Sequence, residues 1–338
     1  MRILVWHVHG GWMDAFVRGQ HEYLIPTTPE RDGWGLGRGG RPWGEHVVEI
    51  APEDVADAGV DLVVLQRPEE LEVAQRLLGG WDVPTVFVEH NAPRVDVPNS
   101  LHPFRDRADL TIAHVTHWND LMWDCGSTRT TVVEHGVVDP GPLYTGELAR
   151  FGAVINEPVR RGRVVGTDLL PRFGAVAPVD VFGMGTEKLV ELGHGDRLVG
   201  MGDVKPDPMH AALAQRRAYV HANRWTSLGL SLIETMHMAM PVLVLATTDA
   251  ARTVPAEAGA IATDVEDLVR ASRLLVDDPE EARRRGLVAR EAVLARHALA
   301  RFTTDWDTLL ADVTAEHAAR HRAAPVGVGS SATAGEDS

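Results

Sequence analysis

The residues best suited to chemistry lie in one segment, 218–246, which reads AYVHANRWTSLGLSLIETMHMAMPVLVLA. An apolar run predicts a buried strand, a polar loop follows it, and the spacing after the loop predicts a helix that begins near Gly229. Backbone N–H groups from Leu228 to Leu230 would stand free at the start of this helix, where they could bind a diphosphate. Glu234, one turn further in, could accept hydrogen bonds from a ribose diol. The alternative, a surface capping glutamate, does not fit its apolar flanks LSLI and TMHM.

Two short patterns resemble cofactor and metal motifs but lack the context that those motifs need. GLGRGG at 35–40 has the glycine spacing of a dinucleotide-binding loop, yet Pro42 and further glycines follow it and no helix begins there. The sequence Asp-Trp-Asp at 305–307 resembles the Asp-x-Asp that holds a divalent metal in some sugar transferases. It falls in a predicted amphipathic C-terminal helix, away from any strand end, so we interpret it as a solvated acidic face.

The histidines and the cysteine do not indicate a catalytic centre by spacing alone. His7 and His9, and likewise His114 and His117, are spaced as zinc ligands could be, but no cysteine or carboxylate completes either pair. Cys125, the single cysteine, lies in the tryptophan-rich stretch WNDLMWDCG, and we predict a buried structural thiol rather than a nucleophile. A chain with one cysteine forms no internal disulfide, which is typical of a reducing compartment.

Length and composition exclude several classes of protein. A chain of 338 residues suggests two domains, and 44% hydrophobic with 24% charged residues excludes a disordered, collagen-like or coiled-coil protein. The formal net charge of −15 would repel a phosphate backbone, so nucleic acid is not expected as a partner. Neither a signal peptide nor an apolar run of about 20 residues is visible. We therefore expect a cytoplasmic protein without a transmembrane segment.

Short apolar runs alternate with helical stretches along most of the chain, which predicts parallel sheets covered by helices. The pattern restarts after a break that contains proline and glycine. We therefore predict an α/β fold of two doubly wound, Rossmann-like domains, at 1–145 and 146–298, that face each other across a cleft. A C-terminal helix at 299–322 would pack back on the first domain, and 323–338 would be a flexible tail. The glycine-rich segment 26–46 is too long for an ordinary connection, and loops of this kind are often functional.

The strand, loop and helix described above resemble the signature of retaining nucleotide-sugar glycosyltransferases of family 4, which have the GT-B fold. That signature has two glutamates separated by seven residues, then Ala-Met-Ala-x-Gly-x-Pro-Val; here Glu234 matches the second glutamate and TMHMAMPV the tail. Gly10 and Gly11 follow the first strand as in the family, and PTVFVEHNAP places His90 where the family has a histidine near the donor sugar. The segments RADLTIAHVTHWNDLMWDCG, EHGVVD and VDVFGMG are similar to further family segments, so the likeness covers residues 1 to about 300.

Two departures from the family pattern concern recognition of the donor. Thr226 stands where the family's first glutamate contacts the donor sugar, which leaves the sugar open and admits an unusual one such as a heptose. Arg160 takes the position of the arginine that neutralises the diphosphate, but Val165 stands at the lysine position. Arg161 or Arg163 could supply the missing charge, since a guanidinium can replace an ammonium electrostatically. The resemblance thus gives His90, Arg160 and Arg163 as catalytic residues, and Gly10, Gly11, Arg161, Thr226, Leu228, Gly229, Leu230 and Glu234 as donor-binding residues.

The resemblance implies that a hexosyl or heptosyl group is moved, with retention of configuration, from a nucleotide diphosphate sugar to a hydroxyl of a small-molecule or glycan acceptor. It implies no metal and no cofactor, because arginines and a helix N-terminus would neutralise the leaving diphosphate. The acceptor would bind mainly to the N-terminal domain, where Trp34 or Trp43 could stack on a sugar ring. Two alternatives remain open: a non-catalytic sugar-nucleotide-binding paralogue, and a sugar-nucleotide epimerase or hydrolase on the same fold.

Overall fold

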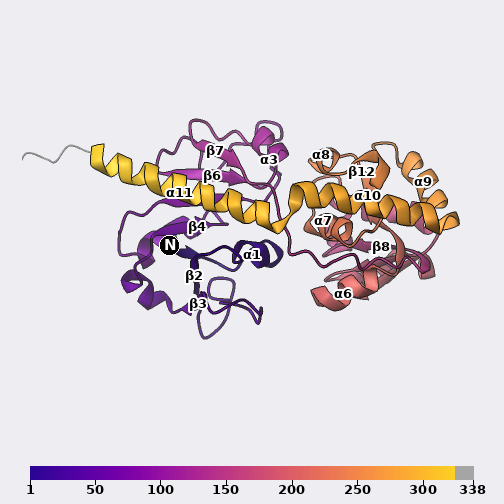
Figure 1. Cartoon of the computed structure of the whole chain (residues 1–338), viewed down its shortest axis with the longest axis horizontal. Helices are drawn as coiled ribbons and strands as arrows, with labels where there is room; N and C mark the ends of the chain where they lie inside the picture. The colour runs from indigo at the N-terminus through magenta and orange to yellow at the C-terminus, as the bar shows by residue number, and fades with distance from the viewer. Residues whose placement is uncertain (324–338) are drawn as a thin grey trace, which may run out of the picture.

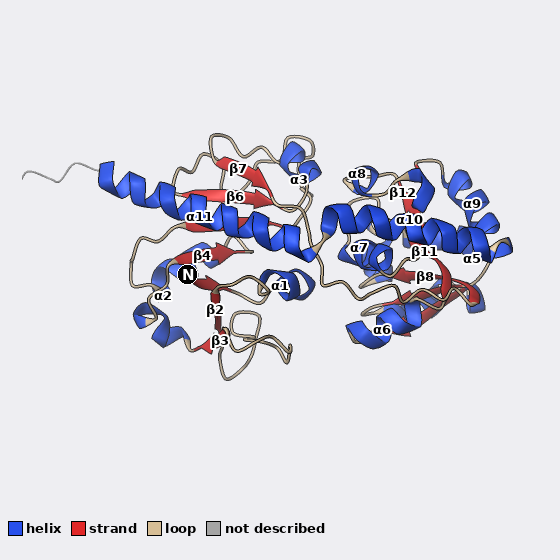
Figure 2. Ribbon diagram, viewed as in Figure 1, coloured by secondary structure: helices blue, strands red, loops and turns tan. Residues whose placement is uncertain are grey.

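The computed structural model describes residues 1–323, which form two α/β domains, each built on one parallel sheet (Figures 1 and 2). Residues 324–338, which make up nearly all of the predicted tail, lie outside the described part. The expected pair of doubly wound domains is confirmed. The predicted boundary at 145/146 falls between the last strand of the first sheet and the first strand of the second.

The N-terminal sheet has seven strands in the order β3-β2-β1-β4-β5-β6-β7, and all neighbours run parallel. Its strands are β1 (Arg2–Val5), β2 (Glu22–Pro26), β3 (Val47–Ile50), β4 (Leu62–Leu65), β5 (Thr85–Glu89), β6 (Leu110–His114) and β7 (Arg129–Val132). Its helices are α1 (Gly10–Phe16), the 3₁₀ helix η1 (Pro52–Asp57), α2 (Glu70–Leu77) and α3 (His117–Met122). Every residue of β4, β5 and β6 is buried, as expected for central strands covered on both faces.

The C-terminal sheet has six parallel strands in the order β10-β9-β8-β11-β12-β13. They are β8 (Leu148–Val154), β9 (Val179–Phe182), β10 (Leu198–Gly202), β11 (Arg216–His221), β12 (Val242–Leu245) and β13 (Gly259–Ala262). The α-helices are α4 (Pro158–Arg161), α5 (Leu170–Gly174), α6 (Pro206–Leu213), α7 (Leu230–His237), α8 (Ala250–Thr253), α9 (Val265–Asp277), α10 (Pro279–His297) and α11 (Leu299–Ala323). The 3₁₀ helices are η2 (Gly162–Val164), η3 (Thr167–Leu169), η4 (Thr186–Leu192), η5 (Gly195–Arg197) and η6 (Ala256–Ala258).

Local sequence signals explain where several helices begin. The side chains of Thr116, Asp264 and Asp278 accept hydrogen bonds from backbone N–H groups in the first turns of α3, α9 and α10. Helix α1 begins at Gly10, and the N–H of Met13 bonds to the carbonyl of His9. The segment 52–57 forms the short 3₁₀ helix η1, with Pro52 at its first position.

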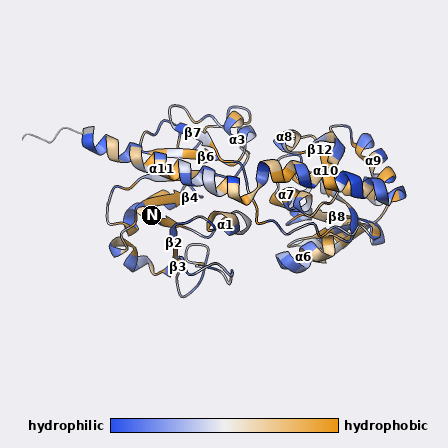
Figure 3. Ribbon diagram, viewed as in Figure 1, coloured by the Kyte–Doolittle hydropathy of each residue, from blue (hydrophilic) through white to orange (hydrophobic). Residues whose placement is uncertain are grey.

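The C-terminal helices join the two domains along one side of the molecule (Figure 1). Helix α10 packs Val293 into the core of the C-terminal domain, and α11 packs Phe302 and Trp306 into that of the N-terminal domain. Ala298 separates the two helices and forms a β-bridge with Val137. The chain passes from the first domain to the second near Val137 and returns near Ala298, so the two connecting segments lie side by side. The strands are mostly hydrophobic in Figure 3, whereas the helices also carry hydrophilic residues. Within residues 1–323, none of the helices combines the length and apolarity that crossing a bilayer requires.

Candidate functional site between the domains

A cavity of about 210 Å³ lies between the two domains, at the carboxyl ends of β1, β5 and β7. This is the edge of a parallel sheet where ligands of such folds bind. The N-terminal domain lines it with His9, Trp12, His90, Asn91, Ala92, Arg94 and His135. The C-terminal domain lines it with Arg161, Trp225, Thr226, Leu228 and Leu230. The cavity thus brings together His90 and four of the eight residues that the sequence suggested for donor binding: Arg161, Thr226, Leu228 and Leu230.

The start of helix α7, which the sequence suggests as a diphosphate-binding segment, forms one wall of this cavity. Leu228 and Leu230 line the wall, and Gly229 between them is the N-cap residue, with no side chain capping the helix. A Cβ atom on Gly229 would lie 2.8 Å from the ring of His221, so only glycine lets the chain pass this close to β11. The N–H groups of Leu230 and Ser231 are therefore available to an anion, whereas that of Leu232 bonds to the carbonyl of Gly229.

Positive charge gathers beside the same wall. Arg161 ends the short helix α4 and lines the cavity, and Arg94 faces it from the N-terminal domain. Burial and the neighbouring charges of Arg94 and Arg160 lower the pKa of Arg161. No carboxylate of residues 1–323 forms an ion pair with Arg94 or Arg161, so an anion bound here would meet uncompensated charge.

The other two predicted arginines lie outside the cavity lining. Arg160 is 70% exposed and lies 3.7 Å from the carboxylate of Glu157. Arg163 is 77% exposed and pairs with Asp168 at 3.2 Å. Val165, at the family's lysine position, is buried in the core of the C-terminal domain. Arg161 is therefore the one of the three that this conformation directs to the cavity.

Three histidines of the N-terminal domain line the cavity. The rings of His9 and His90 stack with centroids 4.0 Å apart. Burial, with the neighbouring rings of His9 and His135, lowers the pKa of His90 well below its ordinary value. Burial lowers the pKa of His135 to about 3. Nε2 of His90, Nδ1 of His135 and Nε1 of Trp12 have no hydrogen-bond partner among the described residues. Neutral imidazoles with unpaired nitrogens suit a neutral polyhydroxyl ligand such as a sugar.

His9 also borders a second, larger cavity of about 690 Å³ within the N-terminal domain. The Nδ1–H of His9 donates to Oε1 of Gln66 at 3.1 Å, since an amide oxygen only accepts, and its Nε2 is then an acceptor. Asn91, Ala92 and Arg94 border both cavities as well. The sequence suggested His9 only through its zinc-like spacing from His7, and it did not indicate Arg94, His135 or Trp225. The single signal for them was their position after predicted strands.

The remaining predicted donor residues lie close to the cavity. Thr226 is on its wall, where the family has glutamate. A Cβ atom on Gly11 would lie 3.0 Å from the side chain of Leu230, so this glycine lets the two domains approach closely. Gly10 is the first residue of α1 and packs against Arg41. Glu234 lies one turn into α7, outside the cavity lining, with its carboxylate 3.3 Å from Nε2 of His210.

The two tryptophans predicted for acceptor stacking differ sharply in exposure. Trp34 is 39% exposed, and the guanidinium of Arg67 lies 4.0 Å from its ring centre. Arg67 in turn borders the second cavity. Trp43 is 5% exposed, and its indole N–H donates to Asp14 at 2.8 Å. The prediction of Trp43 as a stacking residue is therefore corrected, because its ring is buried against His7 and its N–H is bonded to Asp14.

The three sequence patterns that resemble metal, cofactor or nucleophile motifs have structural roles instead. Asp305 pairs with Arg301 at 2.6 Å, and Asp307 lies 3.0 Å from Nε2 of His21, both on α11. The glycine-rich loop at 35–40 does not lead into a helix. Cys125 is buried, as predicted, and burial raises the pKa of its thiol to about 12. A thiol of that kind is not a nucleophile at neutral pH.

Two α/β domains, each built on one parallel sheet, with a cavity between them are the architecture of the GT-B class of fold. Residues 170–278, within the C-terminal domain, match the family model described as "Glycosyl transferases group 1". No curated protein sequence matches the chain. The resemblance to glycosyltransferases that was stated from the sequence is thus confirmed for the segment that the family model covers.

Solved structures give the same fold over nearly the whole chain. Sucrose-phosphate synthase from Thermosynechococcus elongatus is 15% identical, with a TM-score of 0.69; the match covers 94% of this chain and 100% of that one. Alr3699/HepE from Anabaena, solved with UDP-glucose, is 13% identical with a TM-score of 0.69, over 92% and 100%. A glycosyltransferase from Rickettsia africae is 12% identical with a TM-score of 0.66, over 92% and 98%. At these identities the likeness establishes the fold.

Proposed function

We propose that this protein transfers a sugar, with retention of anomeric configuration, from a nucleotide diphosphate sugar to a hydroxyl acceptor, without a metal ion. The observation that carries the proposal is the uncompensated charge of Arg161 and Arg94 beside the uncapped N-terminus of α7. A diphosphate carries the opposite charge and has oxygens that accept from both guanidinium and backbone N–H groups. A cation is not required there, because arginines supply the positive charge.

The diphosphate would lie between Arg161 and the first turn of α7, with the sugar directed toward His90. As the glycosidic bond breaks, negative charge grows on the diphosphate, and preorganised donors stabilise that charge more than they stabilise the ground state. The unpaired Nε2 of His90 would bind a sugar hydroxyl. Thr226, shorter than the glutamate of the family, leaves room for a donor sugar with a different substituent.

The composition of the cavity favours retention by a same-face reaction, in which the leaving phosphate takes the proton of the acceptor. No aspartate or glutamate is among the described residues that line the cavity, so neither a carboxylate nucleophile nor a carboxylate base is at hand. Glu89 of the second cavity is 5% exposed and accepts from the N–H of Asn91 and from Nε2 of His102. Both of its oxygens are therefore occupied.

The second cavity would hold the acceptor, and His9 stands where the two cavities meet. With its Nδ1–H bound by Gln66, Nε2 of His9 would accept a hydrogen bond from the reacting hydroxyl and orient it. We assign His9 as a positioning residue, not as the final proton acceptor. Arg67 and Arg94 on the same walls favour an acceptor that carries hydroxyl or anionic groups.

The experiment is a calorimetric titration with nucleoside diphosphates and their sugars in EDTA, beginning with UDP and UDP-glucose because HepE was solved with UDP-glucose. A bound donor is then incubated with candidate acceptors, and NMR of the product gives the configuration of the new linkage. Transfer with retention in EDTA supports the proposal. Binding without transfer to any acceptor would favour the non-catalytic paralogue, and release of free sugar alone would favour a hydrolase.

A further inference from the structure

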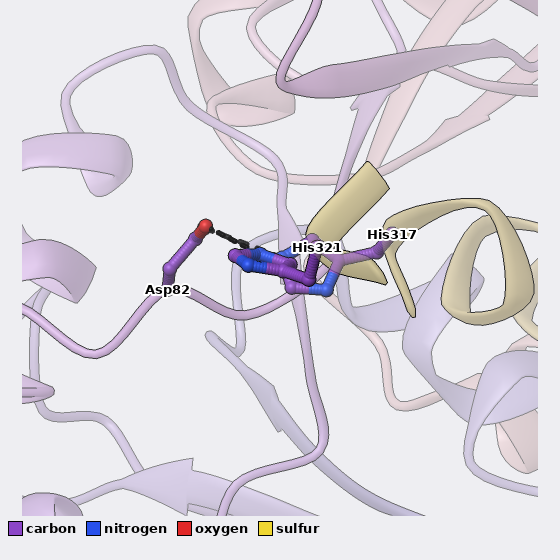
Figure 4. A group of neighbouring side chains, drawn as sticks. All are labelled: Asp82, His317 and His321. Atoms are coloured by element: carbon purple, nitrogen blue, oxygen red, sulfur yellow. Dashed lines mark hydrogen bonds and ion pairs between the residues drawn. The ribbon is translucent and has the colours of Figure 1, made fainter. Parts of the chain in front are cut away.

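A group of three side chains lies on the outside of the N-terminal domain, away from the cavities. Asp82 belongs to the loop between α2 and β5, and His317 and His321 lie one turn apart near the end of α11. Figure 4 shows the two imidazole rings side by side, facing the carboxylate of Asp82. Histidines four positions apart on a helix share one face, so both can reach the same point.

The distances within this group are short enough for the three side chains to share one metal ion. Nε2 of His317 lies 3.3 Å from Oδ1 of Asp82, and Nε2 of His321 lies 2.8 Å from Oδ2. The two Nε2 atoms are 3.2 Å apart. Zinc–nitrogen and zinc–oxygen bonds of about 2.0–2.2 Å at tetrahedral angles would separate neighbouring donor atoms by roughly 3.3–3.5 Å. The two nitrogens and one carboxylate oxygen of Asp82, all within 4.8 Å of one another, are therefore close enough to bind one zinc ion together.

Hydrogen bonds alone cannot give every nitrogen and oxygen of this group a suitable partner. If both Nε2 atoms carry hydrogen and donate to Asp82, two hydrogen-bearing nitrogens face each other at 3.2 Å. If one of them carries none, its contact with the carboxylate places two acceptors together. A metal ion removes the conflict, because it takes the place of both hydrogens and bonds to lone pairs on all three residues.

We propose that Asp82, His317 and His321 bind a divalent transition metal ion of the zinc class, which fastens the end of α11 to the N-terminal domain. Two imidazoles with one carboxylate suit zinc, whereas magnesium and calcium prefer oxygen ligands alone. Asp82 and His321 are 68% and 55% exposed, so an ion can enter from solvent and keep a water as its fourth ligand.

The site is structural and independent of the proposed transfer reaction. His317 lies 18 residues along α11 from Leu299, or roughly 27 Å from the junction of the domains at 1.5 Å per residue. The core side chains of α11 lie between Phe302 and Val313, whereas the helix beyond Val313 is held by polar contacts such as that of Arg129 with Glu316. A metal ion would thus reinforce the part of the helix with less apolar packing.

The test uses the full chain with any affinity tag removed, stripped with EDTA and dialysed. Titration calorimetry with ZnCl₂ should give one ion per chain, and Co²⁺ should give the intense visible absorption of a tetrahedral complex. His317→Ala and His321→Ala should each weaken Zn²⁺ binding by at least about 10–100-fold, since loss of even an outer-shell partner costs that much. The matched control is His194→Ala, a histidine of the C-terminal domain outside this group, which should bind as the wild type does.

Two results would overturn the proposal. One is equal Zn²⁺ affinity in wild type and in both histidine variants. The other is a wild-type melting temperature that Zn²⁺ does not raise, which would mean that the three residues only exchange hydrogen bonds. If His317→Ala does not fold, His321→Ala and Asp82→Ala carry the same test, because both of these side chains are more exposed. Calorimetry, Co²⁺ absorption and melting temperature do not require enzymatic turnover. The metal site can therefore be confirmed or rejected even if the protein transfers no sugar.

Discussion

The hydroxyl of Ser227 in the C-terminal domain donates a hydrogen bond to the backbone carbonyl oxygen of His90 in the N-terminal domain. Asn119 of α3 donates in turn to the Ser227 oxygen at 2.9 Å, and all of this lies in buried surroundings. Ser227 directly precedes the wall formed by α7, and His90 lies on the opposite wall. This bond therefore fixes the distance between the two walls of the cavity, one beside the start of α7 and the other at His90.

Ser227→Ala should loosen the closed arrangement of the domains. The amide of Asn119 loses one acceptor, and a buried group left without its partner costs about 1–3 kcal/mol. We expect a higher donor KM and a larger radius of gyration in small-angle X-ray scattering. The control is Ser272→Ala, a buried serine that bonds to a carbonyl within α9. If both variants change the radius of gyration equally, the bond between the domains has no special role.

Arg161→Ala should reduce kcat more than donor affinity. The guanidinium faces the position where charge develops, and removal of such a donor commonly costs on the order of 10²–10³ in kcat. Arg160→Ala and Arg163→Ala are matched controls on the same segment, and their exposed side chains predict much smaller effects. Steady-state kinetics on the three variants decide between them. A large loss in Arg160→Ala with a neutral Arg161→Ala would return the role to the arginine that the family resemblance indicated.

His9→Ala should lower kcat/KM for the acceptor by roughly 3–10-fold, the value of one hydrogen bond of about 0.5–1.5 kcal/mol. A general base would instead contribute about 10²–10⁴-fold, so the size of the loss separates positioning from proton transfer. His7→Ala serves as the control, because His7 packs on Trp43 and lines neither cavity. A loss above about 10²-fold, accompanied by a changed pH profile, would make His9 the base.

Trp34→Ala should raise the acceptor KM and leave the donor Kd unchanged. The ring of Trp34 lies against the guanidinium of Arg67, which borders the second cavity, so its loss frees that side chain. Trp81→Ala is the control, since Trp81 is 74% exposed and borders neither cavity. Isothermal titration measures the donor and initial rates measure the acceptor. Equal weakening of both substrates would contradict a role confined to the acceptor.

The protein should lose stability in mild acid because several buried histidines stay neutral in the fold. Burial lowers the pKa of His135 to about 3 and the pKa values of His114, His221 and His297 to about 4. In the unfolded chain these groups titrate near 6.5. Below pH 6.5 the unfolded state therefore binds protons that the native state does not, and the free energy of unfolding falls until about pH 4. Each histidine contributes up to about 1.4 kcal/mol per pH unit over that window.

Replacement of one such histidine tests this stability prediction directly. His221→Gln cannot take up a proton, so its loss of stability between pH 7.5 and 5.0 should be smaller than that of wild type by about 2 kcal/mol. Val293→Ala, which removes buried apolar atoms without changing any titration, should lower stability equally at both pH values. Urea unfolding at the two pH values gives the comparison. An unchanged pH dependence in His221→Gln would mean that this ring binds its proton equally well in the folded and unfolded states.

Much of the fold and the central part of the site could be predicted from the sequence, because both depend on local patterns. Strands that are apolar on both faces require helices on both sides, which led to two parallel α/β domains. The loop before α7 carries its own signal, since the polar loop, Gly229 and the apolar helix follow one another in the chain. The burial of Cys125 also followed from its apolar neighbours.

Only the tertiary structure decided which side chains of a given type face the cavity. Arg160 and Arg161 are neighbours in the single turn of α4, so helical geometry points their side chains in different directions. Which of the two faces the cavity depends on how α4 is placed after β8, and the residue types do not reveal it. Trp34 and Trp43 belong to one glycine-rich segment, yet packing against His7 and Asp14 buries only the second. Asp82 meets the histidines at the end of α11 because that helix folds back across the N-terminal domain, and contacts between such distant residues leave no periodic pattern in a sequence.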